Sequence, residues 1–456
     1  MKFTAYHTLL LEIGLLAGAA GCTPAPPPEF RLNMVQAAVS EISPEYQQEI
    51  ANVLGAVFGT PDNPTVLPET GLNQKLLMQA AGPAWTDSDD LTHGLYRLHC
   101  VHCHGISGDG RGPTAQFLNP YPRDYRKGVF KFKSTYAAAK PSDEDLVRIL
   151  HNGIPGTSMP SFSLLPRPEV DALVEYVKYL AIRGELETAL VNFVASELGE
   201  EEAEDEDGEP IMNKDGTPTM VRPKFDPSAD PDQAEVVKSE LTMIVESWAA
   251  AQEQVVMPVE DALPTEDRSA ADYAASVDAG RDLFFGKKAN CFTCHGPTAL
   301  GDGQQNDYDD WTKDFIALEN QIESTKKTLE SLDVAPDDET DQQAADRETR
   351  VARNEVLLDS LEAAYAEIYP IRHAIPRNLR QGVYRGGRRR LDVFYRIHAG
   401  IKGVPMPGTG STNPGGEGTL TEQEIWQIVD YVMSLPYEHA SGPDQDRPVN
   451  EANVTR

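Results

Sequence analysis

Apolar residues recur at helical spacing in several separate stretches of the chain. In residues 169–180, valine and leucine fall at positions i, i+3, i+4 and i+7, which defines one apolar face of a helix. Residues 31–60 show a similar spacing on both sides of Pro44, and residues 233–253 are compatible with one further helix. The periodicity therefore predicts short helices separated by proline-marked turns.

Three sequence blocks occur twice, in the same order. Each set follows a Cys-x-x-Cys-His motif and includes a Gly-Ile-x-Gly-x-x-Met-Pro loop ahead of an amphipathic helix. The matched blocks are 122–131 with 376–385, 151–160 with 398–407, and 169–180 with 424–435. In the second set, Thr421 precedes Glu424 in the pattern of a capping box. The repeat predicts that one helical domain is present in two copies.

Two further segments set the copies apart. The second copy carries an insert at 307–370, whose helical periodicity breaks at Pro336, so an antiparallel helical hairpin is expected. Such a hairpin can be a local brace or a docking element for one partner. Between the copies, 185–271 is predicted to be an acidic linker, because 200–209 holds eight carboxylates in ten residues.

Composition and charge limit the classes of function. The chain has 456 residues and a hydrophobic content of 40%, which favours several small domains over one large core. Its formal net charge is −32, and the sequence pI is about 4.6. No nucleic-acid partner is expected, since such binding needs a basic face. No stretch reaches the ~20 apolar residues that a membrane span requires.

Four of the five cysteines form two Cys-x-x-Cys pairs, each followed directly by histidine. This spacing is that of a c-type haem attachment motif: the two thiols reach the vinyl groups on one edge of the macrocycle, and the histidine can ligate the iron. The residues are Cys100, Cys103 and His104 in the first motif, and Cys291, Cys294 and His295 in the second. The sequence thus predicts two covalently bound haem c groups.

Zinc and thiol redox chemistry are the competing interpretations of these cysteines. A structural zinc site takes four soft ligands close together, whereas each motif offers two thiols and a histidine in an unusual position for zinc. A thioredoxin-like motif belongs in a βαβ setting, which the sequence does not predict. The recurrence of the motif at the head of a repeated domain favours haem.

The methionine in each repeated loop is the predicted sixth ligand of the iron. Met159 and Met406 lie eight residues after the shared histidines, His151 and His398. Glycine lets the backbone pass close to a flat ring, and the proline that follows each methionine stiffens the loop. Histidine with methionine is a known haem pair. His151 and His398 are the rival ligands, although their place at a helix end favours capping or packing.

Both copies resemble class I cytochrome c domains, over residues 88–184 and 272–438. The resemblance implies an all-α fold of two cytochrome c domains around mostly buried haems. It also implies that a proline carbonyl accepts a hydrogen bond from the proximal imidazole, a role that Pro113 fits in the first copy only. Arg123 and Arg377, after the matched prolines, are candidate partners of the haem propionates. The cluster Arg385, Arg388, Arg389 and Arg390 can serve propionates or an acidic redox partner.

The N-terminus has the pattern of an export signal. Residues 1–21 combine a basic start, an apolar run and a small-residue exit, and Cys22 follows directly. This resembles a bacterial lipobox, with Glu12 and Ala19 as departures, and it predicts a signal peptide and lipidation of Cys22. Residues 22–87 are then a lipid-anchor spacer with an N-terminal helical region, and 439–456 form a C-terminal tail. The expected location is periplasmic, at the membrane through the N-terminal lipid.

These features predict an electron carrier rather than an enzyme. Two His/Met sites leave no open position on either iron, so outer-sphere transfer is expected between a donor and an acceptor protein of a respiratory chain or a dehydrogenase. A di-haem peroxidase or oxidase, which needs an open or displaceable site, is the enzymatic alternative. A cytochrome subunit of a dehydrogenase or terminal-oxidase complex is the other alternative, and it differs in partner rather than in chemistry.

Overall fold

The computed structural model describes residues 26–199, 201–203, 210–212, 219–259, 268–304, 308–336 and 339–438. The predicted signal peptide, Cys22 and the C-terminal tail lie outside the described residues, as does most of the acidic run at 200–209. The described chain is mostly helical, which confirms the predicted helical class. Its strands are limited to two short antiparallel pairs, β1 (Trp85–Thr86) with β2 (Thr92–His93) and β3 (Glu201–Glu202) with β4 (Met220–Val221).

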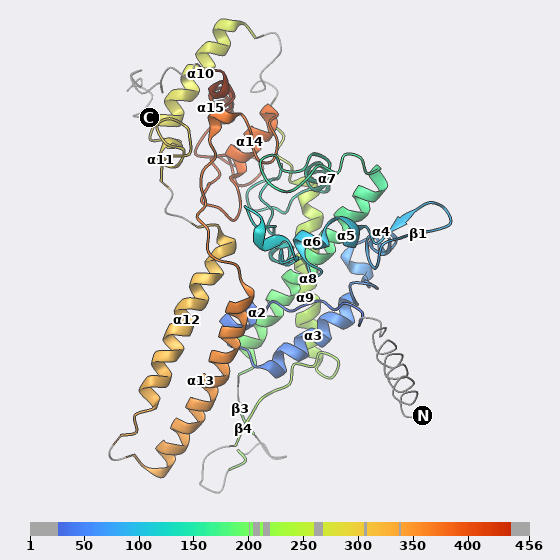
Figure 1. Ribbon diagram of the computed structural model, residues 1–456, viewed down its shortest axis with the longest axis vertical. Helices are drawn as coiled ribbons and strands as arrows, with labels where there is room; N and C mark the ends of the chain where they lie inside the picture. Colours follow the sequence, from blue (N-terminus) through green and yellow to red (C-terminus); the bar gives the residue numbers. More distant parts are fainter. Residues whose placement is uncertain are drawn as a thin grey trace, which may run out of the picture.

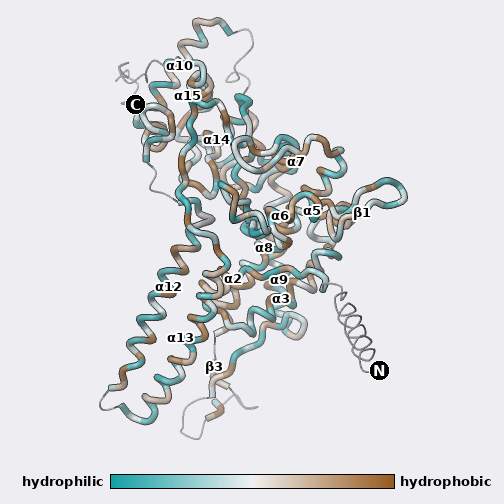
Figure 2. The backbone as a smooth tube through the Cα atoms, in the orientation of Figure 1, coloured by the Kyte–Doolittle hydropathy of each residue, from teal (hydrophilic) through white to brown (hydrophobic). Residues whose placement is uncertain are grey.

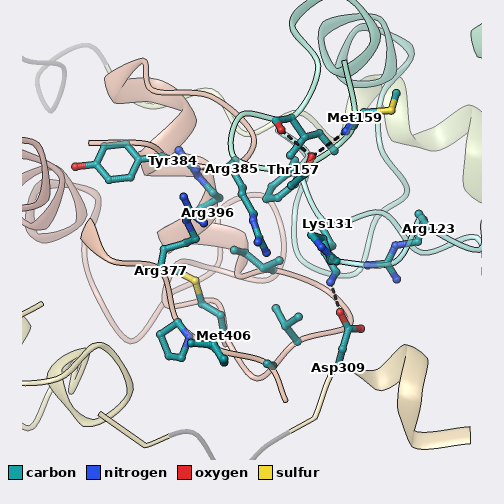
Figure 3. A pocket seen from close by; sticks show the side chains of 18 of the residues that line it. Arg123, Lys131, Thr157, Met159, Asp309, Arg377, Tyr384, Arg385, Arg396 and Met406 are labelled. Atoms are coloured by element: carbon teal, nitrogen blue, oxygen red, sulfur yellow. Dashed lines mark hydrogen bonds and ion pairs between the residues drawn. The ribbon is translucent and has the colours of Figure 1, made fainter. Parts of the chain in front are cut away.

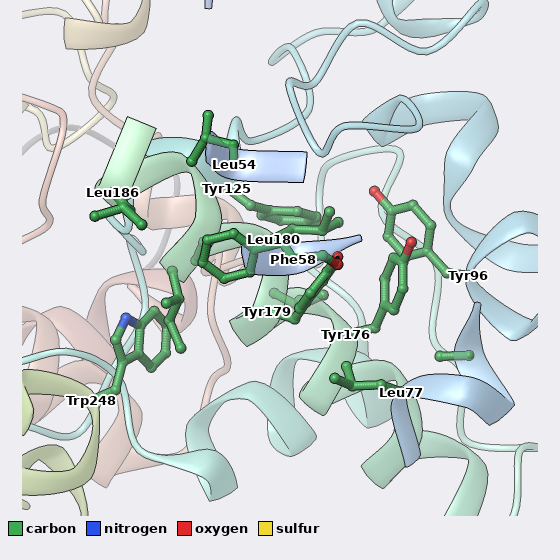
Figure 4. Packing of buried hydrophobic residues seen from close by; sticks show 14 of the residues in the cluster. Leu54, Phe58, Leu77, Tyr96, Tyr125, Tyr176, Tyr179, Leu180, Leu186 and Trp248 are labelled. Carbon is green, nitrogen blue, oxygen red and sulfur yellow. Dashed lines mark hydrogen bonds between the residues drawn. The ribbon is translucent and has the colours of Figure 1, made fainter. Parts of the chain in front are cut away.

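The first hydrophobic core is built around a long central helix, α8, which carries the first amphipathic segment of the repeat (Figure 4). Proline is tolerated in the first turn of this helix, because a backbone N–H in the first turn makes no hydrogen bond within the helix. Tyr176 and Tyr179 of α8 are almost fully buried among residues of the N-terminal helices. The helices of this part are α2 (Met34–Val39), α3 (Pro44–Phe58), α4 (Gln74–Ala80), α5 (Leu95–His99), α6 (Val101–His104), α7 (Asp143–Asn152), α8 (Arg167–Glu197) and α9 (Pro231–Ala250), with 3₁₀ turns η1 (Pro68–Thr70), η2 (Ala115–Phe117), η3 (Tyr125–Lys127) and η4 (Ala251–Glu253).

Part of the segment predicted as a linker belongs to this first core. Helix α8 continues beyond residue 184 to Glu197, and its later residues Leu186 and Leu190 are fully buried. Helix α9 returns along α8, where Leu241 and Trp248 join the same core, and the Trp248 indole donates a hydrogen bond to Glu185 at 2.9 Å. The helix expected at 233–253 is therefore present as α9. The acidic composition of the segment hid the continuation of α8, which buries enough apolar surface to be ordered.

The second core lies where α10 (Ala270–Phe285) packs against α15 (Glu422–Ser434). The two helices approach so closely at Gly280 that a Cβ atom there would lie 1.9 Å from the Gln427 carbonyl oxygen. The predicted capping box is present: Thr421 Oγ1 accepts from the Glu424 N–H, and the Glu424 carboxylate accepts from the Thr421 N–H. The remaining elements of this part are α11 (Phe292–His295), α14 (Arg390–Ala399), η6 (Leu379–Gln381) and η7 (Leu435–Tyr437).

The insert folds as the predicted antiparallel hairpin, formed by α12 (Asp310–Leu332) and α13 (Asp341–Glu367) (Figure 1). Its base packs on α2, through a small cluster of Val35, Ala38, Leu318, Leu361 and Ala364. Figure 2 shows hydrophilic and hydrophobic positions alternating along both helices, as expected for helices with one packed face.

Ion pairs tie this hairpin to the first half of the chain. Lys127 Nζ lies 2.6 Å from Asp314 Oδ2, and Arg111 Nη1 lies 3.3 Å from Glu367 Oε2. Of the two interpretations of the insert, these contacts favour a brace between the halves. Within the described residues, no helix is both long and apolar enough to cross a membrane.

Candidate functional site

One continuous cavity of about 1390 Å³ lies between the two cores (Figure 3). It is larger than the ~300–1,000 Å³ of an ordinary small-molecule pocket. Its lining includes all the predicted attachment cysteines, iron ligands and matched arginines: Cys100, Cys103, His104, Arg123, Met159, Cys291, Cys294, His295, Arg377 and Met406. Two sites that the sequence treats separately therefore face one shared space.

In the first site, a hydrogen bond to the backbone fixes the tautomer of His104. The Nδ1 atom lies 3.1 Å from the Arg123 carbonyl oxygen, and the ring stacks on Tyr125 with centroids 4.6 Å apart. Because a carbonyl only accepts, Nδ1 carries the proton and Nε2 keeps its lone pair. Burial lowers the pKa of His104 to about 4, so the imidazole is neutral near pH 7. A neutral imidazole with one nitrogen held is what metal ligation requires.

This contact corrects the predicted role of Pro113. The partner of His104 is the backbone of Arg123, the residue after the matched proline, and Pro113 does not line the cavity. In the second site the corresponding residue is Arg377. Burial lowers the pKa of His295, and the nearby Arg377 backbone reduces this lowering. The His295 Nδ1 atom nevertheless makes no hydrogen bond of normal geometry. The absence of a proline after the second motif therefore does not distinguish the two sites, since neither uses one.

The four cysteines of the motifs are free thiols. Burial raises the pKa of Cys100 and of Cys291 to about 12, although Cys291 is the more accessible of the two. Redox-active cysteines have lowered pKa values, so these thiols do not fit a thioredoxin-like role. Among the described residues, no three His, Cys, Asp or Glu side chains are grouped to hold a metal ion by themselves.

The two methionine loops have the same backbone hydrogen bond. The N–H of Ile154 donates to the Met159 carbonyl at 3.1 Å, and the N–H of Ile401 donates to the Met406 carbonyl at 2.9 Å. The glycines at the matched positions 153, 156, 400 and 403 all have φ between 63° and 77°, which other residues adopt at a cost. The sequence pattern thus encodes one loop shape, which presents a methionine to the cavity twice.

The rival ligands lie away from the cavity. His151 is exposed at the end of α7, and its Nδ1 lies 3.1 Å from the Asn152 side chain. His398 is 3% exposed and stacks on Phe394, and it is not among the lining residues. Both α7 and α14 end near these histidines, as predicted. The exposed position of His151 favours a role at the helix end, and the buried position of His398 favours packing, over ligation of the iron.

The lining is strongly basic in an acidic protein. It contains six arginine or lysine side chains, and Asp309 is the only carboxylate among the described lining residues. The cations are Arg123, Lys131, Arg372, Arg377, Arg385 and Arg396. The sequence analysis missed Lys131, although the repeat aligns it with Arg385. The other arginines of the 385–390 cluster do not line the cavity.

These residues fit covalently attached haem. The largely apolar cavity offers imidazole and thioether sulfur as iron ligands, thiols for covalent attachment, and arginine and lysine side chains that can pair with haem carboxylates. Each of these groups comes from both halves of the chain. Thiols that carry no disulfide remain available for thioether formation.

Comparison with known proteins agrees for the first half. Residues 93–181 match the Cytochrome c family and form a cytochrome c domain, so the chain is expected to bind haem c covalently and to take part in haem-based electron transfer. No curated protein sequence matches the chain. Among solved structures, a chain of the Kuenenia stuttgartiensis reducing HAO-like protein complex is similar at a TM-score of 0.39 and 19% identity. The similarity covers 75% of this chain and 94% of that chain.

Proposed function

We propose that this protein is a di-haem c-type cytochrome with two tandem cytochrome c domains, which carries electrons outside the bacterial cytoplasm. The observation that carries the proposal is the shared cavity, because both attachment motifs and both methionine loops line it. The second domain is supported by matched features: the motif on α11, the loop at Met406 and the helix α15 stand in the order found in the first domain.

Each half provides two axial ligands and two attachment points. Haem supplies an iron that changes between Fe(III) and Fe(II). His104 and Met159 are the proposed axial pair of the first site, and His295 and Met406 that of the second. The Arg123 carbonyl holds the ring of His104, and the hydrogen bond from Ile154 to Met159 holds the loop. If these four residues hold the two irons, no position would remain for a substrate, which supports a carrier rather than an enzyme.

The location and partners belong to the same proposal. Residues 1–21 are a proposed signal peptide, and Cys22 a proposed lipid anchor to the outer side of the cytoplasmic membrane. The proposed partners are a donor and an acceptor protein of a respiratory chain or a dehydrogenase. The formal net charge of −32 favours partners with basic docking faces, because long-range attraction speeds their encounter.

Removing one attachment motif at a time tests the proposal. Two double variants are needed: Cys100→Ala with Cys103→Ala, and Cys291→Ala with Cys294→Ala. Each should retain one covalent haem and one single-electron wave in a spectropotentiometric titration, where the parent protein shows two. Slow turnover of hydrogen peroxide by the parent is also expected. Rapid turnover, or a double variant that keeps both waves, would overturn the proposal.

A further inference from the structure

Arg123 and Arg377 occupy matched positions in the repeat, and each side chain crosses to the other half of the cavity. Arg377 lies against Gly156, three residues before Met159: a Cβ atom on Gly156 would lie 2.8 Å from Arg377 Nη2. Arg123 lies against Gly403, three residues before Met406, where a Cβ atom would lie 3.3 Å from Arg123 Nη1. The two halves therefore exchange their arginine side chains.

The backbone of each arginine stays with its own half. The Arg123 carbonyl accepts the hydrogen bond from His104, and the Arg377 backbone lies beside His295. Each arginine thus joins the histidine of one site to the methionine loop of the other.

A basic cluster surrounds the exchanged side chains. It consists of Arg123, Lys131, Arg377 and Arg385. Figure 3 shows Arg377, Arg385 and Lys131 in the space between the two methionines and Arg123 beside Lys131. Asp309 pairs with Lys131 and is the only described carboxylate in the lining. The Nε atoms of Arg377 and Arg385 are buried and make no hydrogen bond within the described chain. Buried donors of this kind call for an acceptor, and a planar carboxylate suits a guanidinium best.

We propose that each arginine binds the carboxylates of the haem held by the opposite half, an inference that rests on the di-haem function above. Arg377 then serves the haem attached at Cys100 and Cys103, and Arg123 serves the haem attached at Cys291 and Cys294. A nearby positive charge disfavours Fe(III) relative to Fe(II), so it raises the reduction potential of the haem it faces. The potential of each haem is therefore set partly by the other half of the chain.

Removal of one arginine charge at a time in the full di-haem protein tests whether each arginine serves the haem of the opposite half. Arg377→Gln should lower the midpoint potential of the first-half haem more than that of the second-half haem. Arg123→Gln should do the opposite. The double-cysteine variants, each holding one haem, assign the two waves. Spectropotentiometric titration gives the potentials, and a purely structural role of the arginines would not produce opposite patterns.

Two matched variants complete the design. Arg377→Lys keeps the charge, so it should give a smaller shift of the same sign, and it replaces the glutamine variant if that fails to fold. Arg388→Gln removes an exposed arginine that donates to Tyr437 at 2.9 Å and does not line the cavity, so neither wave should move. Shifts that are equal in both haems, or larger in the arginine's own half, would overturn the exchange. The haem content of the parent protein is measured first. A chain that holds fewer than two haems would contradict the di-haem function, whereas the shifts in potential test only the crossing of the arginines.

Discussion

Replacing Leu361 with alanine should loosen the helical hairpin without disturbing the cavity. Leu361 is 0% exposed and packs with Leu318 and Ala364 against Val35 of α2. Truncation of a buried leucine costs ~2–5 kcal/mol, and the cost falls where neighbours can close the space. Because this cluster has only a few buried members, we expect the lower end, ~2–3 kcal/mol.

Native-state hydrogen exchange measures this loss at the hairpin itself. A free-energy change of ~2–3 kcal/mol corresponds to roughly 30- to 140-fold faster exchange of the protected amides of α2 and of the hairpin base. The matched control is Val356→Ala, in the same helix but 55% exposed, which should change local stability by less than ~0.5 kcal/mol. Equal exchange rates in the two variants would refute the idea that this face braces the halves.

Three further results are expected. Met159→Ala and Met406→Ala should each open one haem to carbon monoxide and halve the near-infrared sulfur-to-iron band; unchanged spectra would exclude these methionines as ligands. Asp430 is fully buried and accepts from Arg268 at 2.7 Å, so Asp430→Asn should lower the free energy of unfolding by ~3–5 kcal/mol in chemical denaturation. Burial lowers the pKa of Lys133 to about 8, against ~10.5 when unfolded, so unfolding takes up a proton between these values. The contribution of Lys133 to the free energy of unfolding should therefore rise from pH 8 to about 10.5. Chemical denaturation across this pH range should show the rise in the parent protein and its loss in Lys133→Met.

Local sequence patterns predicted the local structure well. The capping box at Thr421, the ends of α7 and α14 near His151 and His398, and the hairpin on both sides of Pro336 follow from residues close together in the chain. Such features depend on helical spacing and caps, which a single sequence displays.

Features set by contacts between distant segments were not predictable. The repeat aligned Arg123 with Arg377 but gave no reason for their side chains to cross, because that depends on how the halves pack. The role assigned to Pro113 was wrong for a related reason: the residue that meets His104 lies 19 positions along the chain. The extension of α8 to Glu197 was hidden because a charged segment nearby masked a short run of buried leucines.

The number of covalent haems per chain tests the central claim most directly. Intact mass spectrometry of the purified protein, with a pyridine haemochrome assay against protein concentration, gives this number without any assumption about partners. The account predicts two haems per chain, with one lost in each double-cysteine variant. A single haem, held only within residues 93–181, would contradict the claim that the shared cavity contains two complete sites.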